Sequence, residues 1–378
     1  MTVTEKFTKG TGIVCEYNPF HKGHAYQIHR VKEMGASFVV CAMSGDFTQR
    51  GEPAFQDKYV RAENAVKNGA DIVLEIPFPF CSMSAEGFAS AGISILENSG
   101  LCTSFAFGSE CADAQRLSAV ANLLDKDFHK QVITLQKEKP NLSYASARQM
   151  LVGEKLGQGY AGLLDNPNDI LGIEYLKANK TLCPIAIKRE TPRGGYDENF
   201  VSSSYIRKNL FDSENGQIAR SGLACDVSLD GIYADNGMFY NHLLLSLMQK
   251  KPEQLRGIAE VPSGSEYSIV RCAKKAESYD RLCSLLASKT FTDAKIRRML
   301  LFSLLGVTKS QASEKPLYTE VLAASETGRK MLKKYAEDRQ MLVASRASQI
   351  KESKEALAQY EFSLLASRLV EKCRKISR

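Results

Sequence analysis

The sequence predicts an α/β protein in which a Rossmann-like parallel sheet is followed by a mainly helical domain. Strand-like and helix-like segments alternate through the first half, as in parallel sheets with helical crossovers. Beyond residues 219–228, apolar residues recur mainly at the three- and four-residue spacing of amphipathic helices. We therefore expect a first domain at 10–220 and a helix-rich domain at 221–378.

Short apolar runs predict the strands, because each is bounded by polar, Gly or Pro residues. The runs are Gly12–Glu16, Ser37–Met43, Asp71–Ile76, Leu101–Phe107 and Leu182–Lys188. Helical spacing between these runs predicts helices at Ala25–Met34, Lys58–Lys67, Ala85–Glu97, within 114–156, and at Ile170–Ala178. The second half adds helical patterns at Asn241–Lys250, Ser268–Ala287, Asp293–Leu305 and Lys354–Arg378.

Four polar loops follow predicted strands. In parallel sheets, ligands bind beyond the carboxyl ends of the strands, so these loops should line one crevice. They are Asn18–Gly23, Ser44–Pro53, Pro77–Ser84 and Gly108–Glu110.

The first of these loops carries the strongest chemical signal. It contains His21 and Gly23 and leads directly into His24, which completes a His-x-Gly-His motif between a strand-like run and a helical pattern. Two imidazoles in a first helical turn can face one ligand, and the free N–H groups and dipole of a helix N-terminus favour an anion. Gly23 allows a phosphate to approach the backbone. We interpret the motif as a cation-ready triphosphate site, against the alternative of a turn with surface histidines.

Two further clusters are candidates for the same crevice. Serines at a helix start, followed by cations, suit a second contact to phosphate at Ser203, Ser204, Arg207 and Lys208. Taken alone, this stretch is more typical of an N-cap with surface cations, and its occurrence in one domain with the His-x-Gly-His motif is what favours the phosphate contact. The loop after the second strand offers Asp46, Gln49 and Arg50 to a substrate, or is simply an exposed loop.

Composition excludes several classes of protein. The chain has 378 residues, 44% hydrophobic and 25% charged, and it has no apolar run of membrane-spanning length. Met1–Lys9 is polar and lacks the apolar core of a signal peptide, so we expect a cytoplasmic protein. The ten cysteines are scattered singly without any C-x-x-C pair, which predicts buried thiols rather than disulfides or a metal site.

The positive charge is concentrated in the second half. Residues 1–220 carry 24 Lys and Arg against 25 Asp and Glu, whereas residues 221–378 carry 26 against 18. This imbalance is consistent with a nucleic-acid partner held mainly by the second half. A solvated helical surface with excess Lys and Arg explains it equally well.

Several stretches resemble one bacterial family. GIVCEYNPFHKGHAYQ, SGDFTQRGEPAFQDKYVRAENAVKNGADIVLEIPF, FGSE, NPNDILGIEYLKA and SSSYIRK are similar to the tRNA(Met) cytidine acetate ligases. The resemblance covers most of residues 12–210 and continues more weakly through TFTDAKIRRMLLFSLLGV and ETGRKMLKKY. It implies a nucleotidyltransferase-like catalytic domain related to class I aminoacyl-tRNA synthetases.

The resemblance also implies a reaction and a site. ATP and acetate would give acetyl-adenylate, and the acetyl group would pass to N4 of the wobble cytidine of elongator tRNA(Met). His21 and His24 would be catalytic, and Mg²⁺ would be held mainly by the phosphates of ATP rather than by a protein cage. The implied ATP-binding residues are Val14, Cys15, Glu16, Tyr17, Asn18, Pro19, Phe20, His21, Lys22, Gly23, His24, Ala25, Tyr26, Gln27, Gly108, Asn168 and Arg189.

Two other functions fit parts of the sequence. The first domain alone would suffice for an adenylyltransferase of a small phosphorylated metabolite, although a basic second half favours a larger anionic partner. A non-catalytic RNA-binding protein with a degenerate nucleotide pocket is the third possibility, and the intact His21, Gly23 and His24 argue against it.

Overall fold

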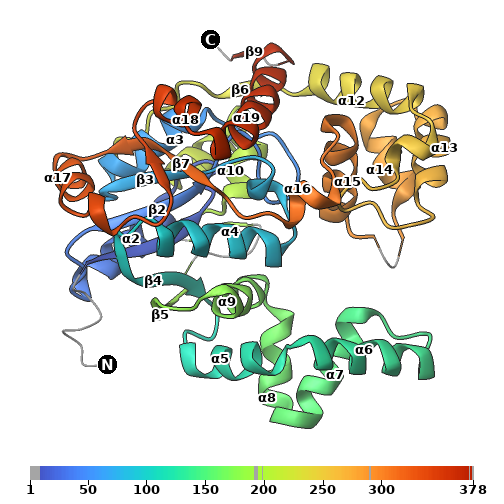
Figure 1. Cartoon of the computed structure of the whole chain (residues 1–378), viewed down its shortest axis with the longest axis horizontal. Coiled ribbons are helices and arrows are strands. Elements are labelled where there is room, and N and C mark those ends of the chain that lie inside the picture. The colour runs from blue at the N-terminus through green and yellow to red at the C-terminus, as the bar shows by residue number, and fades with distance from the viewer. Residues whose placement is uncertain (1–8, 191–194, 198, 289–290, 374, 377–378) are drawn as a thin grey trace.

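A seven-stranded sheet forms the centre of the computed structural model, which describes residues 9–190, 195–197, 199–288, 291–373 and 375–376 (Figure 1). The strand order is β5-β4-β1-β2-β3-β7-β8, and the first five strands along the chain are parallel. The predicted Rossmann-like parallel sheet is therefore confirmed. These five strands are β1 (Gly10–Cys15), β2 (Val39–Ser44), β3 (Ile72–Ile76), β4 (Cys102–Ser109) and β5 (Cys183–Lys188).

Helices cover both faces of this sheet. On one face lie α2 (Lys22–Glu33) and α3 (Lys58–Lys67), and on the other lie α4 (Ala85–Asn98) and α9 (Pro167–Ala178) (Figure 1). Within β2, Cys41 packs with the first pair of helices, and Val40 packs with the second. Burial on both faces explains why the strands are continuous apolar runs rather than alternating ones.

A helical insert connects β4 to β5 and extends away from the sheet beyond α9 (Figure 1). Its N-caps follow directly from the sequence, since Asp113, Asp125 and Ser143 each accept a backbone N–H in the first turn of a helix. The helices of this insert are α5 (Ala114–Leu123), α6 (Lys126–Glu138), α7 (Tyr144–Leu156) and α8 (Gln158–Ala161).

The second half forms a helical body beside the sheet (Figure 1). It is preceded by α10 (Ser203–Asn209), α11 (Gly216–Ser221) and β6 (Tyr233–Asp235). The body comprises α12 (Gly237–Gln249), α13 (Glu266–Lys275), α14 (Tyr279–Leu286), α15 (Asp293–Leu305) and α16 (Lys309–Ser313).

The chain then returns to the sheet, which the sequence analysis did not predict. β7 (Tyr318–Ala324) pairs antiparallel with β3, and β8 (Leu342–Ala344) pairs parallel with β7. A boundary at residue 220 therefore does not separate the sheet from the helices, and the two-domain division stays a prediction. The remaining elements are α17 (Glu326–Lys334), α18 (Ala347–Glu352), α19 (Lys354–Cys373) and β9 (Lys375–Ile376).

Three expectations concern the chain as a whole. All ten cysteines lie within the described residues and are free thiols, but only four are buried, five are half-buried and Cys225 is exposed, so the expectation of buried thiols is correct only in part. None of the described helices combines the length and the apolar character needed to cross a membrane. Of the predicted leader Met1–Lys9, only Lys9 is described, and its ammonium lies 2.7 Å from an Asp338 carboxylate oxygen; the other eight residues lie outside the described part.

Candidate active site

The turn from β1 into α2 is held in a strained conformation by contacts from distant segments. Tyr17 has a φ of +46°, in the left-handed region that side chains other than glycine rarely adopt, and it is buried. The Asn18 carboxamide accepts a hydrogen bond from the Phe55 backbone N–H at 2.6 Å. The Asn18 carbonyl accepts one from Arg207 at 2.6 Å, so α10 is tied directly to the turn.

The two histidines form a stacked pair at the start of α2. His21 is the N-cap, and its Nδ1 accepts the Gly23 backbone N–H at 3.0 Å. The Nδ1 of His24 accepts the His21 backbone N–H at 3.3 Å, and the ring centroids are 3.7 Å apart. Because each Nδ1 is an acceptor, each neutral ring carries its proton on Nε2.

The pKa values of both imidazoles are lowered, so the pair is neutral in the absence of a ligand. Burial, with help from Arg189 and Arg207, lowers the pKa of His21 to about 3. Burial, then the neighbouring His21 and Arg189, also lowers the pKa of His24 well below its ordinary value. The pair can therefore donate N–H groups to a phosphate, while the positive charge of the site comes from Arg189 and Arg207, with Arg50 in the second cavity.

The helix N-terminus differs from expectation, because its first N–H groups are already occupied. The Lys22 N–H donates to the Gly222 carbonyl at 2.9 Å, and the Gly23 N–H is taken by His21. The His24 N–H donates to the His21 carbonyl at 2.9 Å. The imidazole and guanidinium N–H groups, rather than the backbone of α2, are thus available to an anion.

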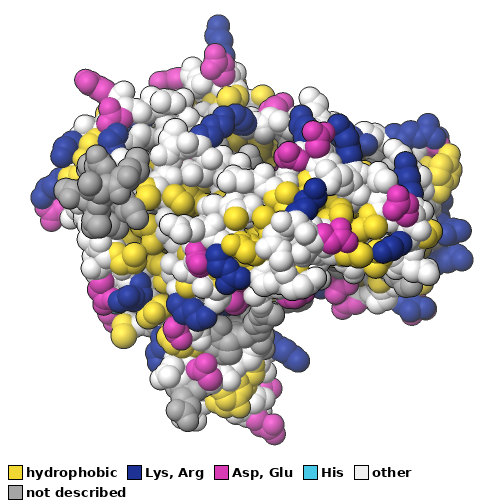
Figure 2. All heavy atoms as spheres, turned by 90° about the horizontal axis from the view of Figure 1, so that it is seen from below, with side chains coloured by type: hydrophobic (Ala, Val, Ile, Leu, Met, Phe, Trp, Pro, Cys, Tyr) yellow, Lys and Arg dark blue, Asp and Glu magenta, His cyan; other side chains and the backbone are white. Residues whose placement is uncertain are grey.

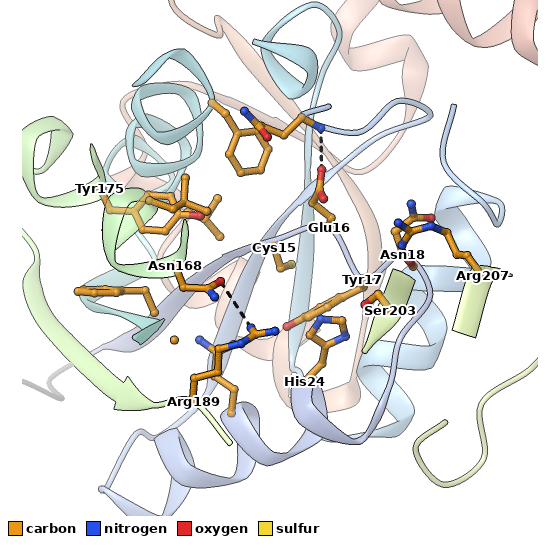
Figure 3. Close-up of a pocket in the computed structure, with 17 residues that line it drawn as sticks. Cys15, Glu16, Tyr17, Asn18, His24, Asn168, Tyr175, Arg189, Ser203 and Arg207 are labelled. Carbon is orange, nitrogen blue, oxygen red and sulfur yellow. Dashed lines mark hydrogen bonds between the residues drawn. The ribbon is translucent and has the colours of Figure 1, made fainter. Parts of the chain in front are cut away.

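These groups line two adjoining cavities of about 210 and 320 Å³ at the carboxyl ends of the strands. Figure 3 shows the first cavity, with Arg189 and Asn168 at one side and Asn18 and Arg207 at the other. The walls common to both cavities are Glu16, Asn18, His24, Asn168, Arg189, Ser203 and Arg207. The predicted His-x-Gly-His motif and the predicted serine–arginine cluster therefore meet in one place.

Gly108 provides an open stretch of wall at the end of β4. A Cβ placed on Gly108 would have no atom within 4 Å, so it would project into the cavity that this residue lines. Beside it, the Asn168 amide donates to Glu110 at 2.8 Å and accepts a hydrogen bond from Arg189 at 3.5 Å. The absent Cβ allows a flat ring or a sugar to approach the strand closely.

Asp169 fixes this wall, although it is not among the site residues predicted from the sequence. Its carboxylate is fully buried and accepts the Ser109 hydroxyl at 2.5 Å and the Glu110 N–H at 3.0 Å. These bonds join the strand end that carries Gly108 to the helix start that carries Asn168. A buried carboxylate satisfied by several donors is a rigid support.

The loop after β2 is only partly a substrate loop. The backbone N–H of Gln49 donates to Glu16 at 2.6 Å, and Gln49 and Arg50 each line one of the cavities. Asp46 lines neither cavity: it accepts the Ser367 hydroxyl at 2.5 Å and lies 3.5 Å from the Lys58 ammonium. The expectation that Asp46 faces a substrate is therefore wrong, because its carboxylate is turned toward α19.

The remaining candidates separate according to where their side chains point. Ser203 and Ser204 line the cavities, whereas Lys208 is exposed and lines neither. The loop Pro77–Ser84 lines neither cavity. It supports the site indirectly, because the Met83 carbonyl accepts a hydrogen bond from the Gln49 side-chain amide at 3.2 Å. Beyond Arg189 and Glu190, residues 191–194 lie outside the described part of the chain.

Within Val14–Gln27, most residues line the two cavities or a third one of about 40 Å³ beside them. Four predicted residues line none of the three: Pro19, Phe20, Lys22 and Ala25. Burial raises the pKa of the Cys15 thiol well above its ordinary value, so Cys15 is a packed neutral thiol rather than a nucleophile.

Two supports of the site carry no local signal in the sequence. Arg61 is fully buried and donates to the carbonyls of Glu16, Ser44 and Gly45, which clamps together the ends of β1 and β2. The apolar end of the first cavity is formed by Phe88, Phe107, Leu171 and Tyr175. On sequence alone, these are ordinary core positions of a strand and two helices.

Metal ligation by the protein has little support within the described part of the chain. No group of three or more His, Cys, Asp or Glu there could hold a metal ion. Glu16 and Glu52 are the carboxylates of the two cavities, and Glu52 is paired with Arg297.

Comparison with known proteins agrees with this geometry. The family described as HIGH Nucleotidyl Transferase matches residues 8–377. The tRNA(Met) cytidine acetate ligase of Acetivibrio thermocellus is 32% identical over 351 residues, covering 86% of this chain and 85% of that one. The enzyme of the same name from Ligilactobacillus salivarius is 35% identical over 341 residues, covering 85% and 86%.

A solved structure extends the similarity to the whole fold. Thermotoga maritima TmcAL bound with alpha-thio ATP superposes with a TM-score of 0.85 at 27% identity, covering 97% of this chain and 94% of that one. Its apo form superposes with a TM-score of 0.88. On these grounds, the chain belongs to the tRNA(Met) cytidine acetate ligase family of HIGH nucleotidyl transferases.

Proposed function

We propose that this protein is an ATP-dependent ligase that activates acetate as acetyl-adenylate and acetylates N4 of the wobble cytidine of elongator tRNA(Met). The observation that carries the proposal is the stacked His21–His24 pair, which lies with Arg189 and Arg207 at the end of β1. The names of the relatives support the choice of acetate and tRNA, and the ATP analogue in the Thermotoga maritima structure supports the choice of nucleotide.

The first step needs positioning and charge rather than a covalent catalyst. An acetate oxygen attacks the α-phosphorus, a new P–O bond forms, and the bond to pyrophosphate breaks with its electrons going to the leaving group. The Nε2–H groups of His21 and His24 donate to the phosphates, and Arg189 and Arg207 offset the charge that develops there. Mg²⁺ suits this site as a phosphate-bound ion that neutralises charge, since the described residues provide few oxygen ligands.

The second step transfers the acetyl group to RNA. The cytidine leaves any base stack and enters the crevice. Its N4 attacks the acetyl carbonyl carbon, the bond to the AMP oxygen breaks, and N4 loses a proton. Because tRNA and ATP meet in the cytoplasm, we place the reaction there. The basic residues of 221–378 form the main tRNA contact in this proposal.

Acetate-dependent ATP–pyrophosphate exchange tests the proposal directly. We expect exchange to require acetate and to occur without tRNA, and then labelled acetate to appear in elongator tRNA(Met). Exchange that depends on a phosphorylated metabolite instead would identify an adenylyltransferase. Absence of any turnover, together with tRNA binding, would identify a non-catalytic RNA-binding protein.

A further inference from the structure

A basic groove lies on the helical insert, outside the candidate active site. It has a volume of about 760 Å³ and lies between α6 and α7 of the insert on one side and α4 and α9 on the other. The insert carries seven Lys and Arg against four Asp and Glu over residues 114–161, a net charge of +3. It is thus basic, although residues 1–220 as a whole are slightly acidic.

The carboxylates in the groove are already engaged. Asp125 caps α6 by accepting the Phe128 N–H at 2.7 Å. Glu174 and Glu86 lie 2.8 and 3.6 Å from the ammonium of Lys177. The acids of the groove therefore hold a helix start and one lysine, and they do not neutralise the cations opposite.

Two of those cations face the groove without a carboxylate. Among the described residues, neither Lys126 nor Arg148 has a carboxylate oxygen within ion-pair distance. The Nε of Arg148 is buried and has no hydrogen-bond partner among these residues. An anionic ligand in the groove would pair with the charged ends of both side chains.

Next to them is an exposed aromatic pair. The Nδ1 of His129 lies 2.8 Å from the hydroxyl of Tyr144, and the ring centroids are 5.5 Å apart. The Tyr144 side chain is 41% exposed although it lines a groove. The two rings are tilted by 50° to each other, and the hydrogen bond holds the exposed Tyr144 ring in place beside the cations.

We propose that this groove binds a single-stranded segment of the RNA substrate, with a base stacked on Tyr144 and backbone phosphates on Lys126 and Arg148. Cations interleaved with exposed aromatic rings suit a nucleotide chain, because bases stack on the rings and phosphates pair with the cations. The inference rests on the proposed function, which supplies an RNA substrate.

The position of the groove fits a strand that also enters the active site. The same two helices line both places: α4 contributes Glu86 to the groove and Phe88 to the first cavity. On α9, Glu174 lines the groove and its neighbour Tyr175 lines the cavity. The groove and the first cavity are therefore formed by the same two helices, α4 and α9.

The test measures the affinity of the full-length protein for fluorescent elongator tRNA(Met) at several salt concentrations. In the variant Lys126→Ala/Arg148→Ala, we expect weaker binding and a slope of log K against log salt that is smaller by roughly 0.7 for each lost phosphate contact. Tyr144→Ala should weaken binding about 5- to 150-fold, whereas Tyr144→Phe should retain binding because its ring still stacks.

Lys137→Ala/Lys139→Ala is the matched control. It removes two exposed charges from the same insert, at the far end of α6 and outside the groove lining. The groove is the wrong assignment if the Lys126/Arg148 variant and Tyr144→Ala bind tRNA as the control does. ATP–pyrophosphate exchange separates failure of the proposed function from failure of the groove assignment. Absence of exchange in the wild type refutes the proposed function. Equal tRNA affinities of all variants with exchange intact refute only the groove.

Discussion

The imidazoles of His21 and His24 stack 3.7 Å apart, with each Nδ1 turned back onto the backbone of α2. This arrangement leaves both Nε2–H groups directed away from the helix start and fixes the tautomer of each ring. Burial keeps both rings neutral, so the pair provides directional N–H donors and adds no charge until a phosphate arrives. The catalytic predictions below depend on this geometry.

Replacing His24 should remove adenylate formation and spare tRNA binding. We expect His24→Ala to slow acetate-dependent ATP–pyrophosphate exchange by about 10²- to 10³-fold, the usual cost of losing one preorganised donor to a transition-state oxyanion. The tRNA affinity should change little. His29→Ala is the control, since His29 lies on the same helix, is exposed and lines none of the described cavities; a loss of the same size in this control would remove the argument for the pair.

The neutral histidines make the fold sensitive to acid. The pKa of His21 falls from 6.5 in the unfolded chain to about 3 in the folded protein, so between these values the unfolded state binds a proton that the native state does not. Unfolding is therefore favoured as the pH falls, by about 2 kcal/mol at pH 5 relative to pH 7.

Urea denaturation at pH 7, 6 and 5 measures this effect. His21→Gln should reduce the dependence of the unfolding free energy on pH, because one of the two groups that take up a proton on unfolding is gone and only His24 keeps its share. His29→Gln should retain the wild-type dependence. An unaltered slope in His21→Gln would show that His21 titrates normally.

A methyl group at Gly108 should interfere with the nucleotide and leave the fold intact. Its Cβ would meet no atom within 4 Å and would occupy space in the first cavity. Gly108→Ala should raise the KM for ATP about tenfold, since one misplaced methyl group costs roughly 1–3 kcal/mol, with little change in melting temperature. Gly162→Ala is matched, because its Cβ is also unobstructed and it lines neither cavity. An unchanged KM in Gly108→Ala would place the nucleotide away from β4.

Sequence patterns predicted those parts of the site that are formed by residues close together in the sequence. His21, Gly23 and His24 are adjacent, and the apolar run before them marks the strand that presents them. The protonation state of the pair was not predictable in this way, because the burial that lowers both pKa values, and the charges of Arg189 and Arg207 that add to it, come from distant segments. Asp46 was assigned wrongly for the same reason, since its hydroxyl partner Ser367 lies 321 residues further along the chain.

The strand β7 shows the corresponding limit for the fold. Thr319 is fully buried, yet it is a polar residue that interrupts an apolar run. Its hydroxyl donates to the Glu75 carbonyl at 2.7 Å, and only this long-range contact makes its burial favourable. A strand that is a continuous apolar run can be predicted from the sequence. A strand whose buried polar residue needs a hydrogen bond to a distant strand cannot.

The contact of Asp46 with Ser367 should be structural. Asp46→Asn weakens the attraction to Lys58 and the hydrogen bond from Ser367, so we expect the free energy of unfolding to fall by about 1–3 kcal/mol. Ser367→Ala should produce a similar loss, and the double variant should lose less than the sum of the two. Urea titrations of the three variants test this coupling; strictly additive losses would mean that the two residues act independently.

The basic surface of the helical body leads to the last prediction. Figure 2 shows Lys and Arg side chains gathered over the outer end of this body, and Lys274 and Lys275 are exposed at the end of α13. Reversing both charges should weaken tRNA binding at low salt and lower the salt slope, because each lysine that neutralises a phosphate releases a counterion. Exchange of ATP with pyrophosphate should be unaffected, since neither residue lines the candidate active site. The conserved-charge variant Lys274→Arg/Lys275→Arg controls for loss of packing. If the reversed variant binds tRNA with wild-type affinity and slope, the helical body is not the docking surface, and the positive charge of the second half serves only solubility.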